Sequence, residues 1–370
     1  MNIFFIFFKK RIDIKKYGCY NNVTVTRITM ENVALKISRN MIAKEAGVTP
    51  TTVSCVLNNT RPVSQKVRQR VMEAVERLNY VPDVMARAMQ GKGTKQIAVM
   101  VDSIKNPFLA ELVYSIEEAG IKKGFFFNIC GKMDLKKYIP NIIARKIDAV
   151  YFCSEIKNDE VQYVRQLLDN GVKVLTGSHF SHFTDEISRI DMATGVAMGK
   201  AVRLLYDKGH TRIACLNTFR VDSGLDSRLD VYLQEMKALG LEPIAISPEH
   251  TISATIENGK ILFEELLRKY PDVTAVIGLN DLVALGAMNE AMRRGFRVPE
   301  DISFIGIDGI ELSRLVVPQL TTFWSNAKAL GQKAFEILYN MIENNEVVSF
   351  NHDMVYLEGE TVRDLRKEKI

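Results

Sequence analysis

Most of this chain alternates short apolar runs with longer amphipathic stretches. The runs lie at residues 97–101, 125–129, 149–152, 172–175, 213–216, 275–278 and 302–307. Between them lie stretches of about ten to fifteen residues with helical spacing of their apolar positions. Continuous apolar runs are typical of strands that are buried on both faces, and a strand, helix, strand order requires parallel pairing. The pattern predicts parallel α/β sheets from residue 96 onward.

The N-terminal part has a different pattern. Ile42 and Ala46 are four residues apart and share one face of a first short helix, which Gly47 can end by taking a positive φ. Thr49 offers an N-cap oxygen, and Pro50 suits the first position of a second helix. Two short helices joined by a glycine turn form a helix-turn-helix.

The second helix has two distinct faces. Its apolar stripe consists of Val53, Val56 and Leu57. Its outward positions are Pro50, Thr51 and Cys55. The outward set is what a DNA major groove would meet. An ordinary helical hairpin is the alternative for this pattern taken alone.

Two further segments follow the second helix. Ser64 is a candidate cap for a third helix that runs to about Asn79, which would complete a small three-helix domain. Residues 79–94 then contain a proline stop, a short helix-capable segment and a Gly, Lys and Thr linker. A helix of one or two turns is not stable alone in water, so this hinge segment should order only when something holds it.

Charge is divided along the same boundary. Residues 31–95 hold eleven Lys and Arg against five Asp and Glu, and residues 1–30 hold six against one. Because the whole chain carries +5, residues 96–370 carry a net −6. The basic charge is therefore confined to the end that would meet phosphate, as counterion-driven DNA binding requires.

The runs AGVTPTTVSCVLN, VSQKVRQRV and NYVPDVMARAM, in that order and spacing, resemble the LacI/GalR family of transcription regulators. The resemblance implies an N-terminal all-α helix-turn-helix domain with a hinge helix, followed by a two-lobed α/β periplasmic-binding-protein-like domain. The expected domains are 30–80 for the helix-turn-helix, 81–95 for the hinge helix and linker, and 96–370 for effector binding and dimerisation.

The resemblance also implies DNA contacts. Base-edge contacts carry over to Pro50, Thr51 and Cys55, backbone contacts to Ser38, Thr52, Ser54 and Asn58, and a minor-groove wedge to Met89. The family usually has leucine at the Met89 position and often arginine at the Cys55 position. Cysteine cannot read a guanine as arginine does, so an altered half-site preference is expected. A thiol switch is the alternative role for Cys55.

Landmarks of the same family recur at 102–108, 190–191, 208–213, 227–230, 279–286, 298–308 and 318–322. In relatives the positions of Arg228, Asn280 and Asp308 bind effector, and these groups suit vicinal hydroxyls. Phe108 or Trp324 would supply an aromatic wall for a sugar ring. The alternatives are an ion pair for Arg228, a turn cap for Asp308 and a core position for Trp324.

Three departures from the family concern the expected pocket. The segment 131–146 is shorter than usual and lacks an Asn/Asp-rich turn. Gly177 stands where many relatives have aspartate, and Gly309 where a second polar residue is common. The N-lobe side of the pocket is therefore unusual, which implies a small or atypical ligand or a lost response to ligand.

Other chemistry finds no support in the residues. Five cysteines, at 19, 55, 130, 153 and 215, form no CxxC pair and indicate reduced thiols. His179 and His182 lack further metal ligands nearby. Residues 91–94 only faintly resemble a phosphate loop, and a flexible linker explains them better. We therefore expect no enzyme, no cofactor and no metal.

The first 29 residues stand apart. Residues 1–8 are apolar, but the basic residues follow them, and the stretch is too short to span a membrane and has no cleavage site. We expect a disordered extension that results from an upstream start codon.

Together these patterns predict a cytoplasmic, homodimeric transcription regulator, a repressor, with no membrane partner. It would bind a pseudo-palindromic operator in double-stranded DNA and respond to a small molecule, with sugars or sugar phosphates ahead of purines. One alternative is a carbohydrate-binding protein of the periplasmic-receptor type, which would have a signal peptide and no helix-turn-helix. Another is a sugar-metabolising α/β enzyme, which would need a catalytic constellation.

Overall fold

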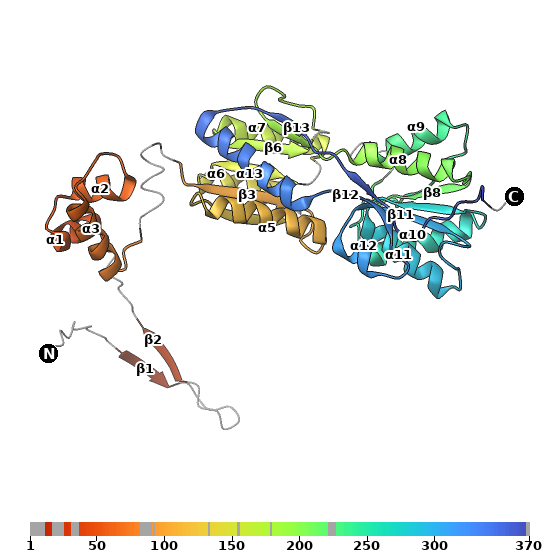
Figure 1. The fold of residues 1–370 in the computed structure, drawn as a ribbon. Helices are drawn as coiled ribbons and strands as arrows, with labels where there is room; N and C mark the ends of the chain where they lie inside the picture. Colours follow the sequence, from red (N-terminus) through yellow and green to blue (C-terminus); the bar gives the residue numbers. More distant parts are fainter. Residues whose placement is uncertain are drawn as a thin grey trace. The chain divides into compact units, whose positions relative to one another are not determined.

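The computed structural model describes residues 12–16, 26–30, 37–81, 91, 93–131, 134–153, 156–177, 180–220 and 227–367. The chain divides into two compact units, Met1–Asp83 and Val84–Ile370. Figure 1 shows both units and labels many of their helices and strands.

The first unit contains a three-helix domain. Its helices are α1 (Arg39–Ala46), α2 (Pro50–Asn58) and α3 (Gln65–Arg77). Gly47 ends α1 with a φ of 63°, a left-handed conformation that glycine adopts without steric cost. Ile42, Val53 and Val71 are fully buried where the three helices meet. The predicted helix-turn-helix is therefore present, with its second helix beginning at Pro50 as expected.

Two strands precede this domain. β1 (Ile12–Lys16) and β2 (Thr26–Met30) pair antiparallel. Two strands alone are at best marginally stable in water. The expected disorder of residues 1–29 stays a prediction, because most of that stretch lies outside the described residues. The hinge residues 82–90, Met89 among them, also lie outside the described residues.

The second unit contains two lobes, and the first of them is built on a parallel six-stranded sheet. In spatial order its strands are β13 (Ser349–Asn351), β7 (Ser188–Asp191), β6 (Lys173–Gly177), β5 (Ala149–Phe152), β3 (Gln96–Val101) and β4 (Phe126–Gly131). Its helices are α5 (Pro107–Ile121), α6 (Leu135–Ala144), α7 (Val161–Asp169) and α13 (Ala327–Asn344), with a 3₁₀ turn at Asn158–Glu160. We call this part the N-lobe.

The C-lobe has a second six-stranded sheet. In spatial order its strands are β14 (Val355–Leu357), β12 (Thr321–Trp324), β11 (Ser303–Asp308), β10 (Ala275–Gly278), β8 (Ile213–Leu216) and β9 (Ile244–Ile246). Only β14 runs antiparallel to its neighbour. The helices are α8 (Thr194–Asp207), α9 (Ser227–Ala238), α10 (Ile256–Lys269), α11 (Asp281–Arg293) and α12 (Glu311–Leu315).

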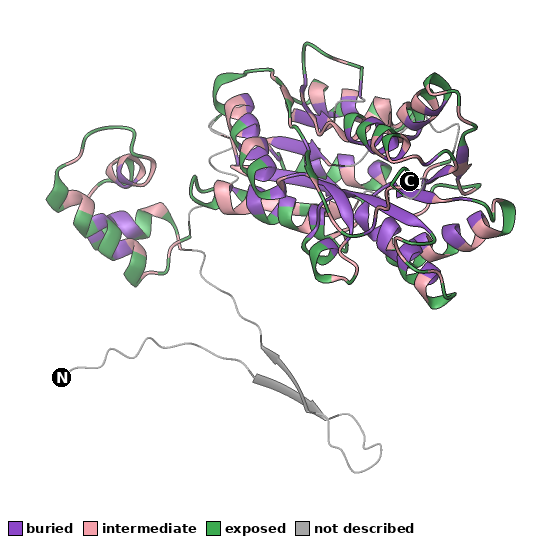
Figure 2. Ribbon diagram, turned by 45° about the vertical axis from the view of Figure 1, so that its right-hand side comes forward, coloured by how far each residue is buried: buried purple, intermediate pink, exposed green. Residues whose placement is uncertain are grey.

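The chain passes between the lobes three times. The passages lie between β7 and α8, between β12 and α13, and between β13 and β14. Both sheets are buried between helices whose outer faces are exposed, which Figure 2 shows. In parallel sheets of this kind, ligands bind beyond the carboxyl ends of the strands. A ligand is therefore expected to bind at the loops that follow the strands of both lobes.

Candidate DNA-binding surface and effector cleft

The second helix of the first unit is held firmly at its amino end. The Thr49 hydroxyl accepts a hydrogen bond from the Thr52 backbone N–H at 3.2 Å and lies 2.9 Å from the Thr52 hydroxyl. Val53 and Val56 are buried against the other helices, whereas Pro50 and Thr51 are exposed. The start of α2 therefore presents a rigid, exposed surface, as the helical spacing predicted.

The backbone-contact candidates lie around this surface. Thr52, Ser54 and Asn58 are half-buried, and the Asn58 amide donates to the Ser54 hydroxyl at 3.1 Å. Cys55, a base-contact candidate, is also half-buried. Ser38 is exposed at the start of α1 and makes no side-chain capping bond. These side chains retain polar atoms at the surface, and such groups typically contact DNA phosphates.

Two arginines of α3 connect the helices of this domain through side-chain contacts. The Arg68 guanidinium donates to the Asn59 side-chain oxygen at 2.7 Å, just beyond the end of α2. Arg77 on α3 pairs with Glu45 on α1 at 2.7 Å. Both pairs are exposed, so each contributes little to stability. The Arg68 pair connects α3 to the end of α2, and the Arg77 pair connects α3 to α1.

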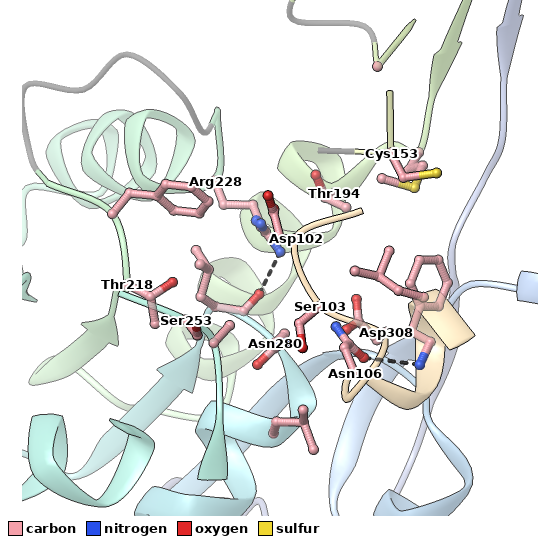
Figure 3. Close-up of a pocket in the computed structure, with 18 of the residues that line it drawn as sticks. Asp102, Ser103, Asn106, Cys153, Thr194, Thr218, Arg228, Ser253, Asn280 and Asp308 are labelled. Atoms are coloured by element: carbon pink, nitrogen blue, oxygen red, sulfur yellow. Dashed lines mark hydrogen bonds between the residues drawn. The ribbon is translucent and has the colours of Figure 1, made fainter. Parts of the chain in front are cut away.

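A cavity of about 470 Å³ lies between the two lobes of the second unit. Residues at or after the ends of β3, β5, β6 and β7 line it from the N-lobe, and residues at or after the ends of β8, β9, β10, β11 and β12 line it from the C-lobe. Met192, Ser325 and Met354, which lie on the three passages between the lobes, also line it. We refer to this cavity as the cleft, and Figure 3 shows its lining.

The C-lobe wall brings the predicted trio together. Asn280 is 4% exposed and caps α11, where its side-chain oxygen accepts from the Val283 N–H at 3.0 Å. This bond uses one lone pair of the oxygen, so the amide nitrogen and the second lone pair can serve a ligand. Arg228 on α9 donates to the Leu279 carbonyl at 2.8 Å, and Asp308 ends β11. All three predicted residues line the cleft.

A carboxylate behind this wall holds the loop that follows Asp308. Asp281 is fully buried, and its two oxygens accept from the Thr322 hydroxyl at 2.5 Å and from the Ile310 N–H at 2.8 Å. A Cβ at Gly306 would lie 2.2 Å from Asp281 Oδ1, so only glycine fits beside it. Burial raises the pKa of Asp281 to about 6, although its hydrogen bonds act in the opposite direction.

The conformation at Gly309 explains why this position has glycine in place of the polar residue that is common in the family. Gly309 has a φ of 68°, and a Cβ there would lie 2.5 Å from the Trp324 Cα. A larger residue would therefore be strained in conformation and would also overlap the neighbouring strand.

The structure corrects the expectation for Trp324. Trp324 is not among the residues that line the cleft, whereas its neighbour Ser325 is. Successive side chains of an extended segment point to opposite sides, which explains why Ser325 faces the cleft and Trp324 does not. Ser325 is 2% exposed, and its hydroxyl has no hydrogen-bond partner within the described part of the chain. The sequence alone did not single out Ser325.

The N-lobe wall combines apolar residues with charged ones. Phe108 is 7% exposed near the start of α5, where the Asn106 side chain accepts from the Phe108 N–H at 3.0 Å. Cys153 follows β5, and burial raises the pKa of its thiol, so it stays protonated. Gly177 also lines the cleft, and a Cβ there would meet no atom within 4 Å. The missing side chain at Gly177 leaves the cleft open on this side.

Charges of both signs line the cleft. The carboxylates are Asp102, Glu160, Asp191 and Asp308, and the cations are Lys105, Lys157 and Arg228. Of these, sequence reasoning singled out only Arg228 and Asp308 as ligand contacts. The near balance of charge disfavours a strongly anionic ligand.

Two absences hold within the residues that the structure describes, one of a metal site and one of a membrane-spanning helix. Within those ranges, no three His, Cys, Asp or Glu side chains are placed to hold a metal ion. No helix in the same ranges is long and apolar enough to cross a bilayer.

A helix-turn-helix unit followed by a two-lobed α/β unit with a central cleft defines the class of ligand-responsive DNA-binding regulators. The profile described as "Bacterial regulatory proteins, lacI family" matches residues 41–83, and that of the "Periplasmic binding protein-like domain" matches residues 202–358. The chain belongs to the LacI family of bacterial regulatory proteins and is a transcription regulator rather than an enzyme.

Relatives of nearly full length support this membership. The HTH-type transcriptional repressor PurR of Mannheimia succiniciproducens is 30% identical over 82% of this chain and 92% of its own length. The repressor of the same name from Vibrio cholerae is 30% identical over 88% of this chain and 98% of its own length.

Solved structures agree on the fold. The Lac repressor dimer, solved with operator and the anti-inducer ONPF, has a TM-score of 0.75 at 24% identity, over 88% of this chain and 99% of that chain. The predicted fold class and family are therefore confirmed. The alternatives of a carbohydrate receptor without DNA binding and of an enzyme fall away.

Proposed function

We propose that this protein is a cytoplasmic repressor that binds a pseudo-palindromic operator as a homodimer. The observation that carries the proposal is the exposed start of α2 on a small basic domain, in a chain whose second unit holds a ligand cleft. The curated relatives are named as repressors, and the Lac repressor was solved as a dimer on its operator. A two-fold dimer matches an inverted repeat, because each protomer reads one half-site.

The proposed domains keep the boundaries that the sequence suggested, 30–80, 81–95 and 96–370. We assign base contacts to Pro50, Thr51 and Cys55, and the minor-groove wedge to Met89. Backbone contacts are assigned to Ser38, Thr52, Ser54 and Asn58. A cysteine at position 55 offers a small surface to the groove in place of a guanidinium, so this operator should differ from those read by an arginine there.

The proposed effector is a neutral, polyhydroxylated molecule such as a sugar. Arg228, Asn280 and Asp308 offer donors and an acceptor along one wall. The Ser325 hydroxyl, which has no hydrogen-bond partner among the described residues, also lines the cleft. Phe108 supplies an apolar surface opposite. Relatives of the same fold were solved with ribose, glucose and cellobiose. The near balance of charge in the cleft favours a sugar over a sugar phosphate.

Regulation would act through the linker. Residues on all three passages between the lobes line the cleft, so a ligand that bridges the walls changes the angle between the lobes. In a dimer this movement changes the spacing of the two linkers and of the hinge helices that must meet on DNA. Folding of the hinge helices on DNA then contributes less free energy to binding, so operator affinity falls.

The proposal is tested by selecting genomic fragments with the purified protein, with and without a panel of neutral sugars and their phosphates. We expect recovery of a short inverted repeat that one neutral sugar releases. Recovery of no fragment at low and physiological salt would contradict DNA binding, and release only by a phosphorylated sugar would contradict the proposed effector class.

The cleft assignment is tested with Asp308→Asn. Asparagine is nearly the same size as aspartate but is neutral and has one acceptor oxygen in place of two, so affinity for the releasing sugar should fall at least about tenfold, or about 1.4 kcal/mol. Operator affinity without sugar should stay the same. Asp185→Asn, at an exposed carboxylate outside the cleft, is the matched control.

A further inference from the structure

The end of the linker is held by a single carboxylate. Asp148 accepts hydrogen bonds from the backbone N–H of Thr94 at 2.9 and 3.0 Å and from that of Lys95 at 2.6 Å. Gly93 and Lys95 have φ values of 64° and 55°, which turn the two successive N–H groups toward one point. Consecutive amides arranged in this way form an anion-binding nest, and a carboxylate is a strong acceptor for them.

The surroundings show that this contact is part of a packed structure. Thr94 is 5% exposed, and its hydroxyl donates to the Lys146 carbonyl at 2.8 Å. A Cβ at Gly93 would lie 3.1 Å from both Asp148 carboxylate oxygens, so the backbone lies against the carboxylate. The Lys95 ammonium donates to the Lys123 carbonyl at 2.9 Å. The last linker residues are therefore bound to two separate turns of the N-lobe.

Asp148 is itself fixed in the sheet. Its backbone N–H donates to the Gln96 carbonyl at 2.9 Å, and its carbonyl accepts from the Lys173 N–H at 3.0 Å. These bonds place Asp148 between the amino ends of β3 and β6, immediately before β5. A carboxylate held by backbone bonds on both sides moves with the sheet.

β3 and β5, which begin beside Asp148, reach the cleft at their carboxyl ends. β3 is followed by Asp102 and β5 by Cys153, and both residues line the cleft. Strands of this length are about 13 to 20 Å long and are stiff along their axes. The anchor and the N-lobe wall of the cleft are thus opposite ends of one rigid layer.

We propose that Asp148 is a positioning residue that fixes the direction in which the linker leaves the N-lobe and so couples the cleft to DNA binding. The inference rests on the proposed function. Without the carboxylate, residues 93–95 gain freedom, and the two hinge segments of a dimer meet less often in the arrangement that a specific operator requires. Binding to non-specific DNA does not need that arrangement, because it depends on charge alone.

The test compares Asp148→Ala, Asp148→Asn and the control Asp169→Ala in the full-length protein. Asp169 is an exposed N-lobe carboxylate that pairs with Arg165 and not with the linker. The probes are the operator fragment selected by the wild type and a scrambled duplex of the same length. We expect Asp148→Ala to lose at least about tenfold in operator affinity and less than twofold in scrambled-duplex affinity, with Asp148→Asn between it and the wild type because one acceptor oxygen remains.

Hydrogen exchange of the free protein is the second measurement. The Thr94 and Lys95 amides should be protected in the wild type and in Asp169→Ala, and should exchange faster in Asp148→Ala. Unprotected amides in the wild type would overturn the anchor itself. Operator affinity within twofold of the wild type in Asp148→Ala would overturn its role in coupling. A wild type that selects no operator would instead overturn the proposed function and the coupling role together.

Discussion

Individual side chains behind the cleft shape it as much as those that line it. Asp281 lies beside Asn280 in the sequence, yet its carboxylate turns away into the core and holds the backbone of Ile310 and the hydroxyl of Thr322. Those two bonds fix the loop after Asp308. The position of one proposed ligand contact therefore depends on a carboxylate that is fully buried behind it.

The raised pKa of Asp281 predicts a particular pH dependence of stability. The pKa rises from an ordinary value of 3.8 to about 6, so the folded state binds this proton more tightly than the unfolded state does. The stabilising effect of protonation is complete below about pH 3.8 and is lost as the pH rises through 6. Between pH 4.5 and 7 this group should cost the wild type about 2 kcal/mol relative to Asp281→Asn, which does not titrate.

Chemical denaturation of both proteins across this pH range measures the difference. Burial lowers the pKa of His210 from its ordinary value of 6.5, so its titration has the opposite sign, with stability lost as the pH falls below 6.5 toward the lowered pKa. That contribution is common to both proteins and cancels in their difference. Parallel curves for wild type and variant would show that Asp281 does not titrate as stated.

Close packing between α10 and α11 sets the geometry of the C-lobe. A Cβ at Gly286 would lie 1.9 Å from the Ile256 carbonyl oxygen, and one at Gly259 would lie 2.2 Å from that of Val283. Backbone atoms cannot move aside as side chains can, so both helices need glycine where they meet. This contact positions α11, and with it Asn280 at the cleft wall.

Gly286→Ala should therefore destabilise the protein by about 3 kcal/mol, the upper end for overpacking, even though alanine favours helices. Gly199→Ala in α8 is the matched control, because its Cβ would come only within 3.3 Å of a Val231 side-chain carbon. The control should be neutral or slightly stabilising. Equal denaturation midpoints for the two variants would contradict the packing argument.

The whole protein joins a DNA-reading unit to a ligand-binding unit of opposite net charge. Residues 31–95 are basic and residues 96–370 are acidic, which concentrates phosphate attraction at one end of the chain. Under the proposed function the hinge between these parts orders on the operator, with an apolar wedge from each protomer entering the minor groove.

Met89→Gly should accordingly weaken operator binding by at least tenfold, about 1.4 kcal/mol, because glycine removes the wedge and disfavours the hinge helix. Sugar affinity should not change. Met89→Leu, which keeps an apolar side chain of similar size, should bind the operator like the wild type. Fluorescence anisotropy with the selected operator measures all three proteins, and equal loss of operator and sugar affinity in Met89→Gly would refute the mechanism.

Much of the fold and part of the cleft could be predicted because they depend on local patterns. The Thr49 cap, the Pro50 start of α2 and the apolar runs of the sheets follow from spacing within a few residues. Arg228, Asn280 and Asp308 were found through resemblance to a family, not through any pattern of their own. The short strands β13 and β14 escaped prediction, because three residues carry too little periodicity.

The amino-acid sequence by itself determined the helices of the first unit, the central strands of both sheets, where the basic charge lies, and which family the chain resembles, since each of these depends on neighbouring residues or on their order. Only the tertiary structure decided that Ser325 and not Trp324 lines the cleft, that Asp281 holds the loop after Asp308, and that Asp148 binds amides 53 and 54 residues away. The reason is physical: burial, orphaned polar atoms and carboxylate partners arise when distant segments pack together, and no local pattern records which segments will meet.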